Sequence, residues 1–362
     1  MIVGIDVSQV IYGTGSSAYT RNLVKGLLAD DPEVEYKLFG GSLRRHADLK
    51  SFYKSLEGNF KATAYPLSPA IANILWNQLH IINIENFLGD LDVFHSSDWT
   101  QPPTKAKKVT TIHDLSPLLF PQFTHPRIVN IHKKRLEWVK KEVDIVIVPS
   151  LSTKNDVTNY GIESKRVKII PEAVESMFNP VKKEVIIPIK NKFGIKQNYL
   201  LFVGVNPRKN IERTVKAFVK VSSVVPLQLV IVGKPTNASI VNNPNIIFTG
   251  HISSAELIGL YSGAEALVYT SLYEGFGLPI LEAFACLCPV VCSNISSLPE
   301  VAGDAAVLVD PLSVESIEAG IIKILQNHRK FIVRGKKRVK LYSWENNAKE
   351  TLNIYKNLYN LS

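Results

Sequence analysis

Short apolar runs rich in Val and Ile alternate with longer amphipathic segments from one end of the chain to the other. The runs lack the strict apolar–polar alternation of a half-exposed strand, so they favour parallel strands that are buried on both faces. We predict strands at residues 2–7, 36–39, 93–95, 109–112, 145–148 and 167–170, and at residues 200–205, 227–232, 246–249, 266–269, 290–292 and 306–309. Strands that alternate with helices in this way predict an α/β protein with two doubly wound parallel sheets.

Several predicted helices carry start or stop signals. Ser253 and Glu256 have the spacing of a capping box, and Pro279 suits the first turn of a later helix. Gly161 suits the end of a helix that begins near Ser150. These signals support helices in the gaps between the strands.

The regular alternation breaks within residues 171–196, where Pro180, Pro188 and a Lys-rich stretch interrupt it. We therefore predict an N-terminal domain over residues 1–175 and a C-terminal domain over residues 176–342. A further helical pattern at residues 343–358 is left over once the second sheet is complete.

Composition narrows the class of protein. The chain has 362 residues, of which 46% are hydrophobic, and this is enough for two domains with buried cores. No apolar run approaches the ~18 residues needed to span a bilayer, and the N-terminus lacks the basic region of a signal peptide. The sequence thus disfavours a secreted or membrane-spanning protein and favours a cytoplasmic one.

The three cysteines, Cys286, Cys288 and Cys292, lie close together in the sequence. Such usage disfavours a disulfide framework and suits a reducing compartment. Metal ligation is the alternative, but no His or second Cys pair lies nearby, and residues 289–291 are typical of a buried strand. We expect small buried side chains here and no metal site.

The charge balance is basic, with 42 Lys and Arg against 32 Asp and Glu and a formal net charge of +10. The excess is not concentrated in one arm, and no DNA- or RNA-binding signature accompanies it. We therefore expect anionic small molecules or an anionic membrane surface as partners, and no nucleic acid.

Ligands of open parallel sheets bind beyond the carboxyl ends of the strands, and four polar segments follow predicted strands. The first follows the strand at 266–269 and contains Glu274, Gly275, Phe276, Gly277 and Leu278, with Glu282 one turn into the next helix. The glycines let the backbone approach a ligand closely, and the helix start offers unpaired N–H groups. Two carboxylates placed in this way suit the hydroxyl groups of a sugar or a ribose. The alternative is an ordinary loop with a surface glutamate.

The second segment follows the strand at 200–205 and carries Arg208 and Lys209, with Asn210 as a predicted cap of the next helix. Two cations beside a helix N-terminus suit a diphosphate that is bound without a metal ion. A solvated basic pair on a loop is the alternative.

The other two segments are less specific. His113 and Asp114 follow the strand at 109–112, where a histidine can exchange a proton with a substrate or orient it, although structural histidines are common. Residues 13–17, which include Gly15, are similar to a phosphate-binding loop but match neither the Walker nor the complete G-x-G-x-x-G pattern.

Together these segments resemble the retaining glycosyltransferases of family 4. The residues that carry the resemblance are Glu274 and Glu282 in an E-x7-E pattern, Gly204 with residues 207–210, residues 113–115, and residues 297–301 with 303–305. The resemblance covers nearly the whole chain. It implies the GT-B fold of two facing Rossmann-like domains, with a C-terminal helix over residues 343–362 that crosses back to pack on the N-terminal domain.

The resemblance also implies an activity, namely transfer of a hexose from a nucleoside-diphosphate sugar to an acceptor hydroxyl with retention of the anomeric configuration. GDP-mannose is the favoured donor, and a sugar or a lipid-linked saccharide is the expected acceptor. The donor would lie mainly on the C-terminal domain and the acceptor mainly on the N-terminal one. The implied donor-binding residues are Gly15, Arg208, Lys209, Glu274, Gly275, Phe276, Gly277, Leu278 and Glu282, and the implied catalytic residues are Glu274, His113, Arg208 and Lys209.

In this scheme Arg208 and Lys209 neutralise the departing diphosphate, Glu282 holds the ribose, and Glu274 holds the sugar, which His113 orients. We expect no cofactor and no metal, because the cationic pair takes the place of a divalent ion. The one Asp-x-Asp pattern, residues 90–92, precedes a predicted strand and so lies at its amino end, away from the predicted site.

The sequence departs from the family pattern at two points. Glu172 and Ala173 stand where family members often have Asn-Gly, which places an additional carboxylate near the predicted site. Leu287 stands where Gly is usual, and we expect only a packing change there. Two alternative functions remain: a nucleotide-sugar epimerase of the same fold, for which no matching set of acidic and histidine residues is found, and a catalytically silent sugar-nucleotide-binding protein.

The helix predicted at residues 126–143 has a basic face. Arg127, Lys134 and Lys141 recur at seven-residue spacing with Lys133 and Lys140 beside them, and apolar residues lie on the opposite side. A solvated helix face is one interpretation. The hypothesis to test is peripheral contact with the anionic inner face of a membrane, where a lipid-linked acceptor would lie.

Overall fold

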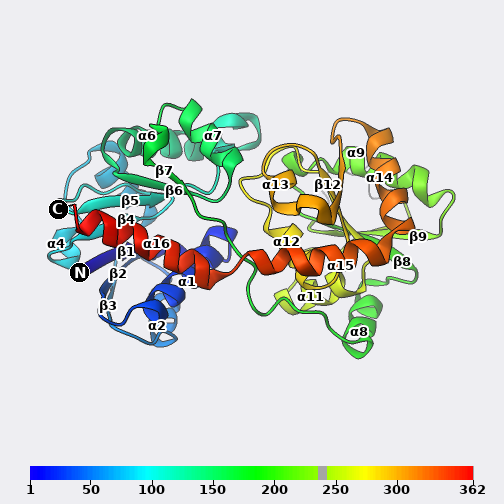
Figure 1. The fold of residues 1–362 in the computed structure, drawn as a ribbon, viewed down its shortest axis with the longest axis horizontal. Coiled ribbons are helices and arrows are strands. Elements are labelled where there is room, and N and C mark those ends of the chain that lie inside the picture. The colour runs from blue at the N-terminus through cyan, green and yellow to red at the C-terminus, as the bar shows by residue number, and fades with distance from the viewer. Residues whose placement is uncertain (235–242, 362) are drawn as a thin grey trace. The chain divides into compact units, whose positions relative to one another are not determined.

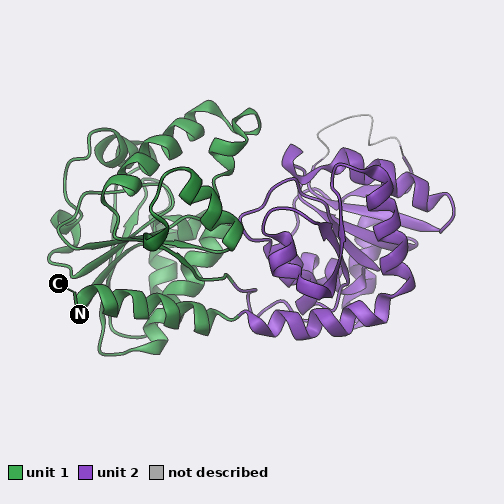
Figure 2. Ribbon diagram, turned by 45° about the horizontal axis from the view of Figure 1, so that its top comes forward, with its two compact units in different colours: residues 1–172, 343–362 green, residues 173–342 purple. Residues whose placement is uncertain are grey.

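The computed structural model describes residues 1–234 and 243–361, and its internal contacts divide the chain into two compact units (Figures 1 and 2). Unit 1 consists of Met1–Glu172 and Ser343–Ser362, and unit 2 consists of Ala173–Tyr342. Each unit is built on one parallel sheet with helices on both faces, which confirms the predicted α/β class.

Unit 1 holds a seven-stranded sheet in the order β3-β2-β1-β4-β5-β6-β7. Its strands are β1 (Ile2–Asp6), β2 (Glu35–Gly41), β3 (Phe60–Tyr65), β4 (Val93–Ser96), β5 (Lys107–Thr111), β6 (Ile145–Val148) and β7 (Val167–Ile169). Within β6, Ile147 packs into a core on one face of the sheet, whereas Val146 and Val148 pack into a second core on the other. The strand order reverses between β1 and β4, and ligands of such sheets bind beside that point.

The longer helices of unit 1 are α1 (Gly15–Asp30), α2 (His46–Lys54), α6 (Pro126–Glu142), α7 (Leu151–Asn159) and α16 (Trp344–Tyr359), and short ones are α3 (Pro69–Ala72), α4 (Glu85–Leu88) and α5 (Ser116–Leu119). Single turns are η1 (Ser8–Ile11), η3 (Pro121–Phe123) and η4 (Ser164–Arg166), and η2 (Asn73–Gln78) is a π-helical segment.

The terminal helix α16 packs against α1 within unit 1, as the resemblance implied (Figure 1). It begins where expected, because the Ser343 hydroxyl accepts a hydrogen bond from the Asn346 N–H (3.1 Å) and caps the helix. Deeper in the core, the Tyr355 hydroxyl and Nδ1 of His95 form a 2.6 Å hydrogen bond. Burial lowers the pKa of His95 to about 3, so this histidine is neutral and structural.

Unit 2 holds a sheet in the order β10-β9-β8-β11-β12-β13. Its strands are β8 (Asn198–Val203), β9 (Leu227–Val232), β10 (Ile246–Phe248), β11 (Ala266–Tyr269), β12 (Val290–Ser293) and β13 (Ala306–Val309). Its helices are α8 (Lys183–Phe193), α9 (Ile211–Ser222), α11 (Ser254–Gly263), α12 (Leu278–Ala285), α13 (Leu298–Ala302), α14 (Val314–Gln326) and α15 (His328–Arg338), with turns η5 (Pro207–Lys209), η6 (Gly303–Ala305) and η7 (Val339–Leu341). The order reverses between β8 and β11.

Every predicted strand is present, with ends that differ by at most two residues, but β3 was not predicted. This edge strand pairs only with β2, and its sequence FKATAY alternates partly buried and exposed positions. Its pattern therefore differs from that of the buried runs on which the other predictions rest.

The segment expected to interrupt the alternation is also more ordered than predicted, because α8 spans Lys183–Phe193 with Pro188 inside it. Ile189 and Phe193 of this helix pack against the core of unit 2. This burial offsets the backbone hydrogen bond that a proline inside a helix removes.

None of the helices within residues 1–234 and 243–361 is long and apolar enough to cross a membrane.

Candidate functional site

Two of the predicted polar segments meet at the point where the strand order of unit 2 reverses. Residues 204–210 follow β8, and residues 270–277 follow its neighbour β11. Both segments leave the carboxyl ends of adjacent parallel strands. They therefore occupy the position at which open α/β sheets bind ligands.

Lys209 joins the two segments. Its Nζ donates to Oε1 of Glu274 (2.6 Å) and to the Tyr269 hydroxyl (2.6 Å), and it lies 4.6 Å from the centre of the Tyr269 ring. The side chains of Lys209 and Glu274 are only 16% and 11% exposed. Gly204 makes room for the lysine stem, because it has φ +91° and a Cβ there would lie 3.3 Å from Lys209 Cε.

Arg208 lies in the same turn, η5, with its guanidinium 5.8 Å from the centre of the Tyr273 ring. Asn210 lies at the predicted N-cap position of α9, but its side chain does not cap the helix. Its buried side chain instead donates to the carbonyl oxygens of Thr270 (3.1 Å) and Pro311 (2.7 Å), and α9 begins without a side-chain cap. These buried carbonyls need a donor, so the amide ties the loop to the neighbouring chain segments.

Hydrogen bonds from two serine hydroxyls fix the glycine-containing loop at residues 274–277. The Ser296 hydroxyl donates to the Glu274 carbonyl (2.6 Å), and the Ser297 hydroxyl lies 2.9 and 2.7 Å from the carbonyl oxygens of Glu274 and Phe276. Gly277 has φ +113°, and a Cβ there would lie 2.8 Å from a Leu298 methyl group. The loop is thus fixed before α12 begins, with Pro279 in its first turn as predicted.

Glu282 lies on α12 and is half-buried. Its Oε2 accepts a hydrogen bond from the Tyr261 hydroxyl (2.8 Å). Burial raises the pKa of Glu282 to about 7, although the Tyr261 hydrogen bond opposes the rise. The carboxyl group therefore exchanges its proton near neutral pH.

The remaining predicted residues lie in unit 1. His113 follows β5, and its Nδ1 lies 2.7 Å from Oε1 of the buried Glu172. Burial lowers the pKa of His113, but the hydrogen bond and charge of Glu172 outweigh it, so the pKa is raised overall. Gly15 is the first residue of α1, next to its cap Thr14, and it is exposed.

The structure thus brings Arg208, Lys209 and Glu274 together in unit 2, where Glu282 follows on α12, and it places His113 and Gly15 in unit 1. Glu172, which departs from the family pattern, contacts His113. Sequence reasoning missed Tyr269, which is the last residue of its strand and pairs with Lys209. A tyrosine at a strand end beside a polar loop was the available signal.

The residues considered for metal binding lie elsewhere. Asp92 directly precedes β4, and its carboxylate accepts the Ile2 N–H (2.6 Å), so it lies at the amino edge of the sheet as predicted. The three cysteines are buried and form no disulfide. Among residues 1–234 and 243–361, no group of three or more His, Cys, Asp or Glu side chains is arranged to hold a metal ion.

A further feature that the sequence reasoning missed is an exposed aliphatic segment in unit 1. Its large exposed side chains, each at least 41% exposed, are Ile71, Ile74, Leu79, Ile81 and Ile82. The segment contacts the predicted basic helix, because Trp138 of α6 stacks on His80 (3.6 Å) and donates to the Asn77 carbonyl (3.1 Å). Apolar side chains therefore adjoin the basic helix.

Comparison with known proteins agrees with these features. The chain matches the model of "Glycosyltransferase Family 4" over residues 13–176 and that of "Glycosyl transferases group 1" over residues 185–348. Similar solved structures include a sucrose-phosphate synthase from Thermosynechococcus elongatus (TM-score 0.74, 19% identity, all of both chains). Another is Anabaena HepE in complex with UDP-glucose (TM-score 0.69, 14% identity, 98% of this chain and 99% of that one). At these identities the likeness shows the shared fold.

A curated relative is closer in sequence. The chain is 32% identical to the O-antigen chain mannosyltransferase B of Escherichia coli over 370 aligned positions, which cover 95% of this chain and 96% of the relative. The family models, the fold and this relative support glycosyl transfer in glycan biosynthesis and do not support the epimerase alternative. The chain belongs to the GT-B glycosyltransferases of family 4.

Proposed function

We propose that the protein transfers mannose from a nucleoside-diphosphate donor such as GDP-mannose to a saccharide hydroxyl, with retention of configuration and without a metal ion. The observation that carries this proposal is the contact between Lys209 and Glu274. A cation suited to a diphosphate and a carboxylate suited to sugar hydroxyls lie side by side. A sugar diphosphate presents these same two groups next to each other.

The pair suggests how donor binding uses the site. In the structure Lys209 neutralises Glu274. A diphosphate beside Arg208 and Lys209 competes for the ammonium group, which leaves the Glu274 carboxylate to accept hydrogen bonds from the sugar. Charge-assisted hydrogen bonds of this kind are about twice as strong as neutral ones.

The chemical task of these residues is to stabilise the leaving group. As the glycosidic bond breaks, positive charge grows on the sugar ring and negative charge grows on the diphosphate. Arg208 and Lys209 are positioned in advance for that negative charge, so they act without reorganising during the reaction. We assign the proton of the acceptor hydroxyl to a phosphate oxygen of the leaving group.

Two further residues complete the proposed assignment. Glu282 holds the ribose. When its carboxyl group is ionised, it accepts hydrogen bonds from both ribose hydroxyls. His113 orients the sugar, since its contact with Glu172 favours the protonated, donating form of the ring. Mannose as the transferred sugar is supported by the name of the relative. Guanosine as the base comes from the family resemblance alone and is part of the proposal.

We also propose that the protein works on the cytoplasmic side of a membrane, in peripheral contact with anionic lipid. The support comes from α6, whose Leu136 and Val139 are buried while Lys133, Lys140 and Lys141 are exposed. The exposed aliphatic segment at residues 71–82 lies against this helix. Basic residues beside exposed apolar side chains suit an anionic bilayer surface.

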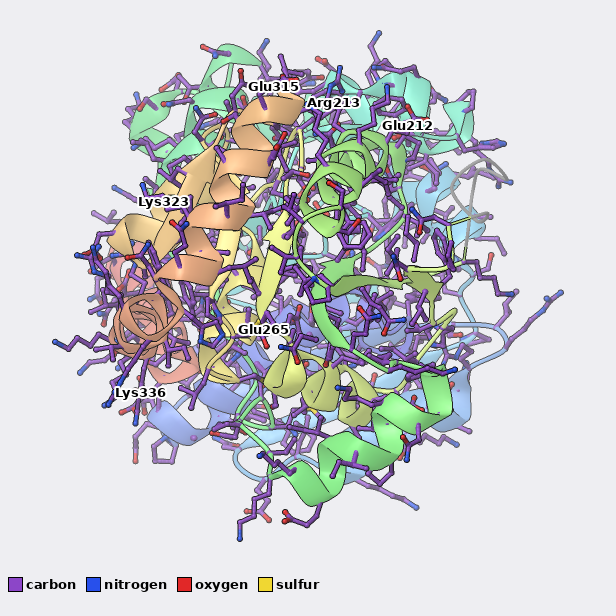
Figure 3. All side chains as sticks on the ribbon, turned by 90° about the vertical axis from the view of Figure 1, so that its right-hand side faces the viewer. Glu212, Arg213, Glu265, Glu315, Lys323 and Lys336 are labelled. Carbon is purple, nitrogen blue, oxygen red and sulfur yellow. The ribbon has the colours of Figure 1, made fainter. Side chains whose placement is uncertain are left out.

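The test of the donor site is the variant Arg208→Ala/Lys209→Ala. Donor turnover should fall by roughly two or more orders of magnitude, because both charges that stabilise the leaving group are lost. A matched control is Lys336→Ala/Lys337→Ala, an exposed basic pair on α15 of the same unit, whose Lys336 points away from the sheet (Figure 3). The control should keep full activity.

Loss of Lys209 also removes the partner of Glu274, so the thermal midpoint of each variant must be measured beside its activity. Arg208→Ala alone, which leaves the Lys209–Glu274 pair in place, provides a second measurement. Near-normal turnover in a folded double variant would remove the assignment of these cations.

A further inference from the structure

Tyr269 is the last residue of β11, and neither the sequence pattern nor the family resemblance assigns it a role. Its strand pairs with β8 on one side and with β12 on the other, and the tyrosine is 1% exposed, within the core of unit 2. The sheet fixes the backbone and the core fixes the ring. The hydroxyl group therefore has a defined position at the carboxyl end of the sheet, where the proposed donor site lies.

The hydroxyl group of Tyr269 contacts both charged residues of that site. It accepts a hydrogen bond from Nζ of Lys209 (2.6 Å), and the same ammonium group donates to Oε1 of Glu274 (2.6 Å). Burial, the negative charge of Glu274 and a hydrogen bond to Glu274 raise the pKa of Tyr269 well above its usual range, so the phenol stays neutral. The hydroxyl group is thus an acceptor for Lys209 and a donor to Glu274.

Lys209 needs such a partner because a lysine side chain is long and flexible. Gly204 leaves room for its stem, and the ammonium group lies 4.6 Å from the centre of the Tyr269 ring. The lysine side chain is only 16% exposed, and an unpaired ammonium group in so buried a place would be costly. Partners within the protein therefore determine where the positive charge lies.

The two partners of Lys209 differ in what they leave for a ligand. Glu274 neutralises the ammonium charge, and under the proposed function it turns to the sugar when the donor binds. Tyr269 is uncharged, so its hydrogen bond orients the ammonium group without cancelling the charge that a diphosphate needs. Because an ammonium group has three N–H donors, one can stay on Tyr269 while two bind phosphate oxygens.

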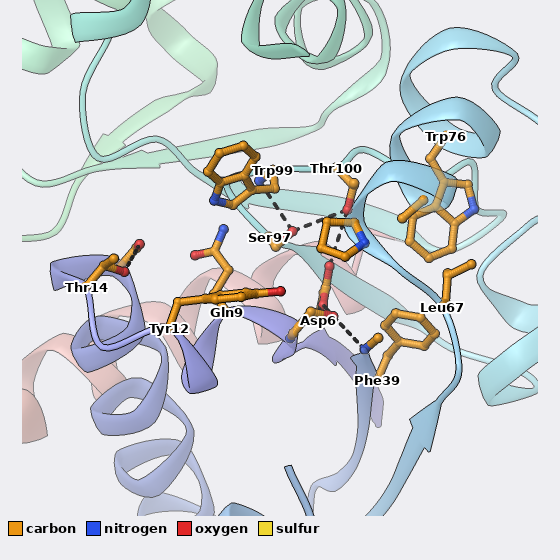
Figure 4. A pocket seen from close by; sticks show the side chains of 15 residues that line it. Asp6, Gln9, Tyr12, Thr14, Phe39, Leu67, Trp76, Ser97, Trp99 and Thr100 are labelled. Carbon is orange, nitrogen blue, oxygen red and sulfur yellow. Dashed lines mark hydrogen bonds between the residues drawn. The ribbon is translucent and has the colours of Figure 1, made fainter. Parts of the chain in front are cut away.

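A pocket of about 320 Å³ in unit 1 provides a contrast (Figure 4). Asp6 lies inside it, and none of the described residues that line it is Lys or Arg. An anion there would meet a buried acidic group and no compensating positive charge. Of these two places, only the unit 2 site offers cations to a diphosphate, and Lys209 is one of its two.

We propose that Tyr269 is a positioning residue of the donor site, whose hydroxyl group holds the Lys209 ammonium group in place for the diphosphate while Glu274 binds the sugar. This inference rests on the proposed function and deepens it, because it names the side chain that keeps the cation in position. In this scheme Tyr269 touches neither the sugar nor the diphosphate and acts through Lys209.

The test is the variant Tyr269→Phe, which keeps the ring and deletes only the hydroxyl group. We expect kcat to fall about tenfold and the KM for the acceptor to stay unchanged, because the lost contact serves the leaving group. The Kd for GDP or UDP, whichever the wild type binds, should rise about tenfold. Isothermal titration calorimetry of the full chain measures this binding, and the thermal midpoint of each variant is measured beside it.

A double-mutant cycle with Lys209→Ala shows whether Tyr269 acts through Lys209. If it does, Tyr269→Phe has no further effect on nucleotide affinity once the ammonium group is absent. A general loss of packing or stability would instead weaken binding by the same factor in both backgrounds.

The matched control is Tyr199→Phe. Tyr199 is also buried in unit 2, near the start of β8, and its hydroxyl group donates to the Leu260 carbonyl (2.7 Å). Deleting this hydroxyl group removes a buried hydrogen bond that does not involve Lys209. The thermal midpoint should therefore fall, while kcat and nucleotide affinity stay those of the wild type.

Nucleotide binding by the wild type separates this inference from the proposed function. If Tyr269→Phe binds the nucleotide and turns over as the wild type does, the role of Tyr269 is overturned and the proposed function stands. The same holds if Tyr269→Phe weakens binding equally with and without Lys209. If the wild type binds neither GDP nor UDP, the proposed function itself is overturned.

Discussion

The residues that we propose bind the donor in unit 2 are held by side-chain partners within the protein. Lys209 is bound by Glu274 and Tyr269, and Glu282 is bound by Tyr261. The Lys209–Glu274 contact pairs two opposite charges in a largely buried place, where an unpaired charge would be costly. Under the proposed function, a donor that carries both negative charge and hydroxyl groups would offer each of these residues an alternative partner.

Glu282 gives a prediction about stability and pH. Because its pKa is raised in the folded protein, the stability that it contributes is present below the unfolded pKa near 4.5 and is lost as the pH rises through 7. Glu282→Gln lacks this titration. As the pH rises from 5 to 8, the free energy of unfolding of this variant should therefore increase by about 1–3 kcal/mol relative to that of the wild type.

Urea unfolding of both proteins across that pH range measures the difference directly. Glu212→Gln on the surface of α9 is the matched control, since Glu212 is exposed (Figure 3), and its unfolding curve should run parallel to that of the wild type. If the free energy of unfolding of Glu282→Gln depends on pH in the same way as that of the wild type, the Glu282 carboxyl group is not forced toward its neutral form.

Residue types at the site were predictable, whereas their partners were not. Arg208, Lys209, Glu274 and His113 follow strand ends, and position after a parallel strand is visible in the sequence. The contact of Lys209 with Tyr269 joins residues 60 positions apart, and it depends on which strands are neighbours. No local pattern carries that information.

At the scale of elements, prediction succeeded where burial on both sides makes a strand uniformly apolar. The inner strands β9, β11 and β12 of unit 2 are buried almost throughout, whereas β3 of unit 1 lies at an edge and alternates. The helix α8 was missed because Pro188 was interpreted from local propensity alone. Its packing against the core outweighs that propensity, as tertiary contacts often do.

Leu287 provides a test of backbone strain at the end of α12. It has φ +61°, in the left-handed region that costs a non-glycine residue roughly 1–2 kcal/mol. The departure from the usual family glycine is therefore a backbone change, and not only the packing change that we expected. Leu287→Gly and Leu287→Ala both remove the leucine side chain beyond Cβ, but only glycine also removes Cβ and so relieves the strain.

We predict that the Gly variant is more stable than the Ala variant by about 1 kcal/mol, which corresponds to a difference of about 2–4 °C in the thermal midpoint of a unit of this size. This order is the reverse of that found inside a helix, where Ala is preferred. Differential scanning calorimetry measures it. A more stable Ala variant would mean that Leu287 is not strained.

At the scale of the whole molecule, the chain forms two units, and its last helix returns to the first of them. The alternating pattern predicted two sheets, but the return of α16 came only from the family resemblance. The apolar positions of α16 predict that one face of the helix is buried, but they do not indicate which unit buries it. The buried contact between Tyr355 and His95 joins residues that lie 260 positions apart in the sequence.

The basic surface of unit 1 gives a prediction about membranes. The protein should sediment with anionic liposomes at low salt and less so at high salt, because each basic residue near such a surface contributes about 1 kcal/mol. Lys134→Glu/Lys141→Glu on α6, where Lys134 is half-buried and Lys141 is exposed, should weaken binding about tenfold or more. The control Lys50→Glu/Lys54→Glu reverses two exposed charges on α2 and should bind as the wild type does. Equal sedimentation with neutral and anionic liposomes would refute the proposed contact.

The most direct measurement of the central claim is mass spectrometry, together with NMR to assign sugar and anomeric configuration, of the products formed from GDP-mannose and other nucleoside-diphosphate hexoses, with and without mannose-containing saccharide acceptors. Our account predicts that the nucleoside diphosphate is released and the acceptor gains one hexose with the donor's anomeric configuration, and that EDTA leaves the rate unchanged. An epimerised nucleotide sugar, or no turnover with any donor, would contradict the assignment of this site to glycosyl transfer. Loss of activity in EDTA that manganese restores would contradict the proposed role of Arg208 and Lys209 in place of a metal ion.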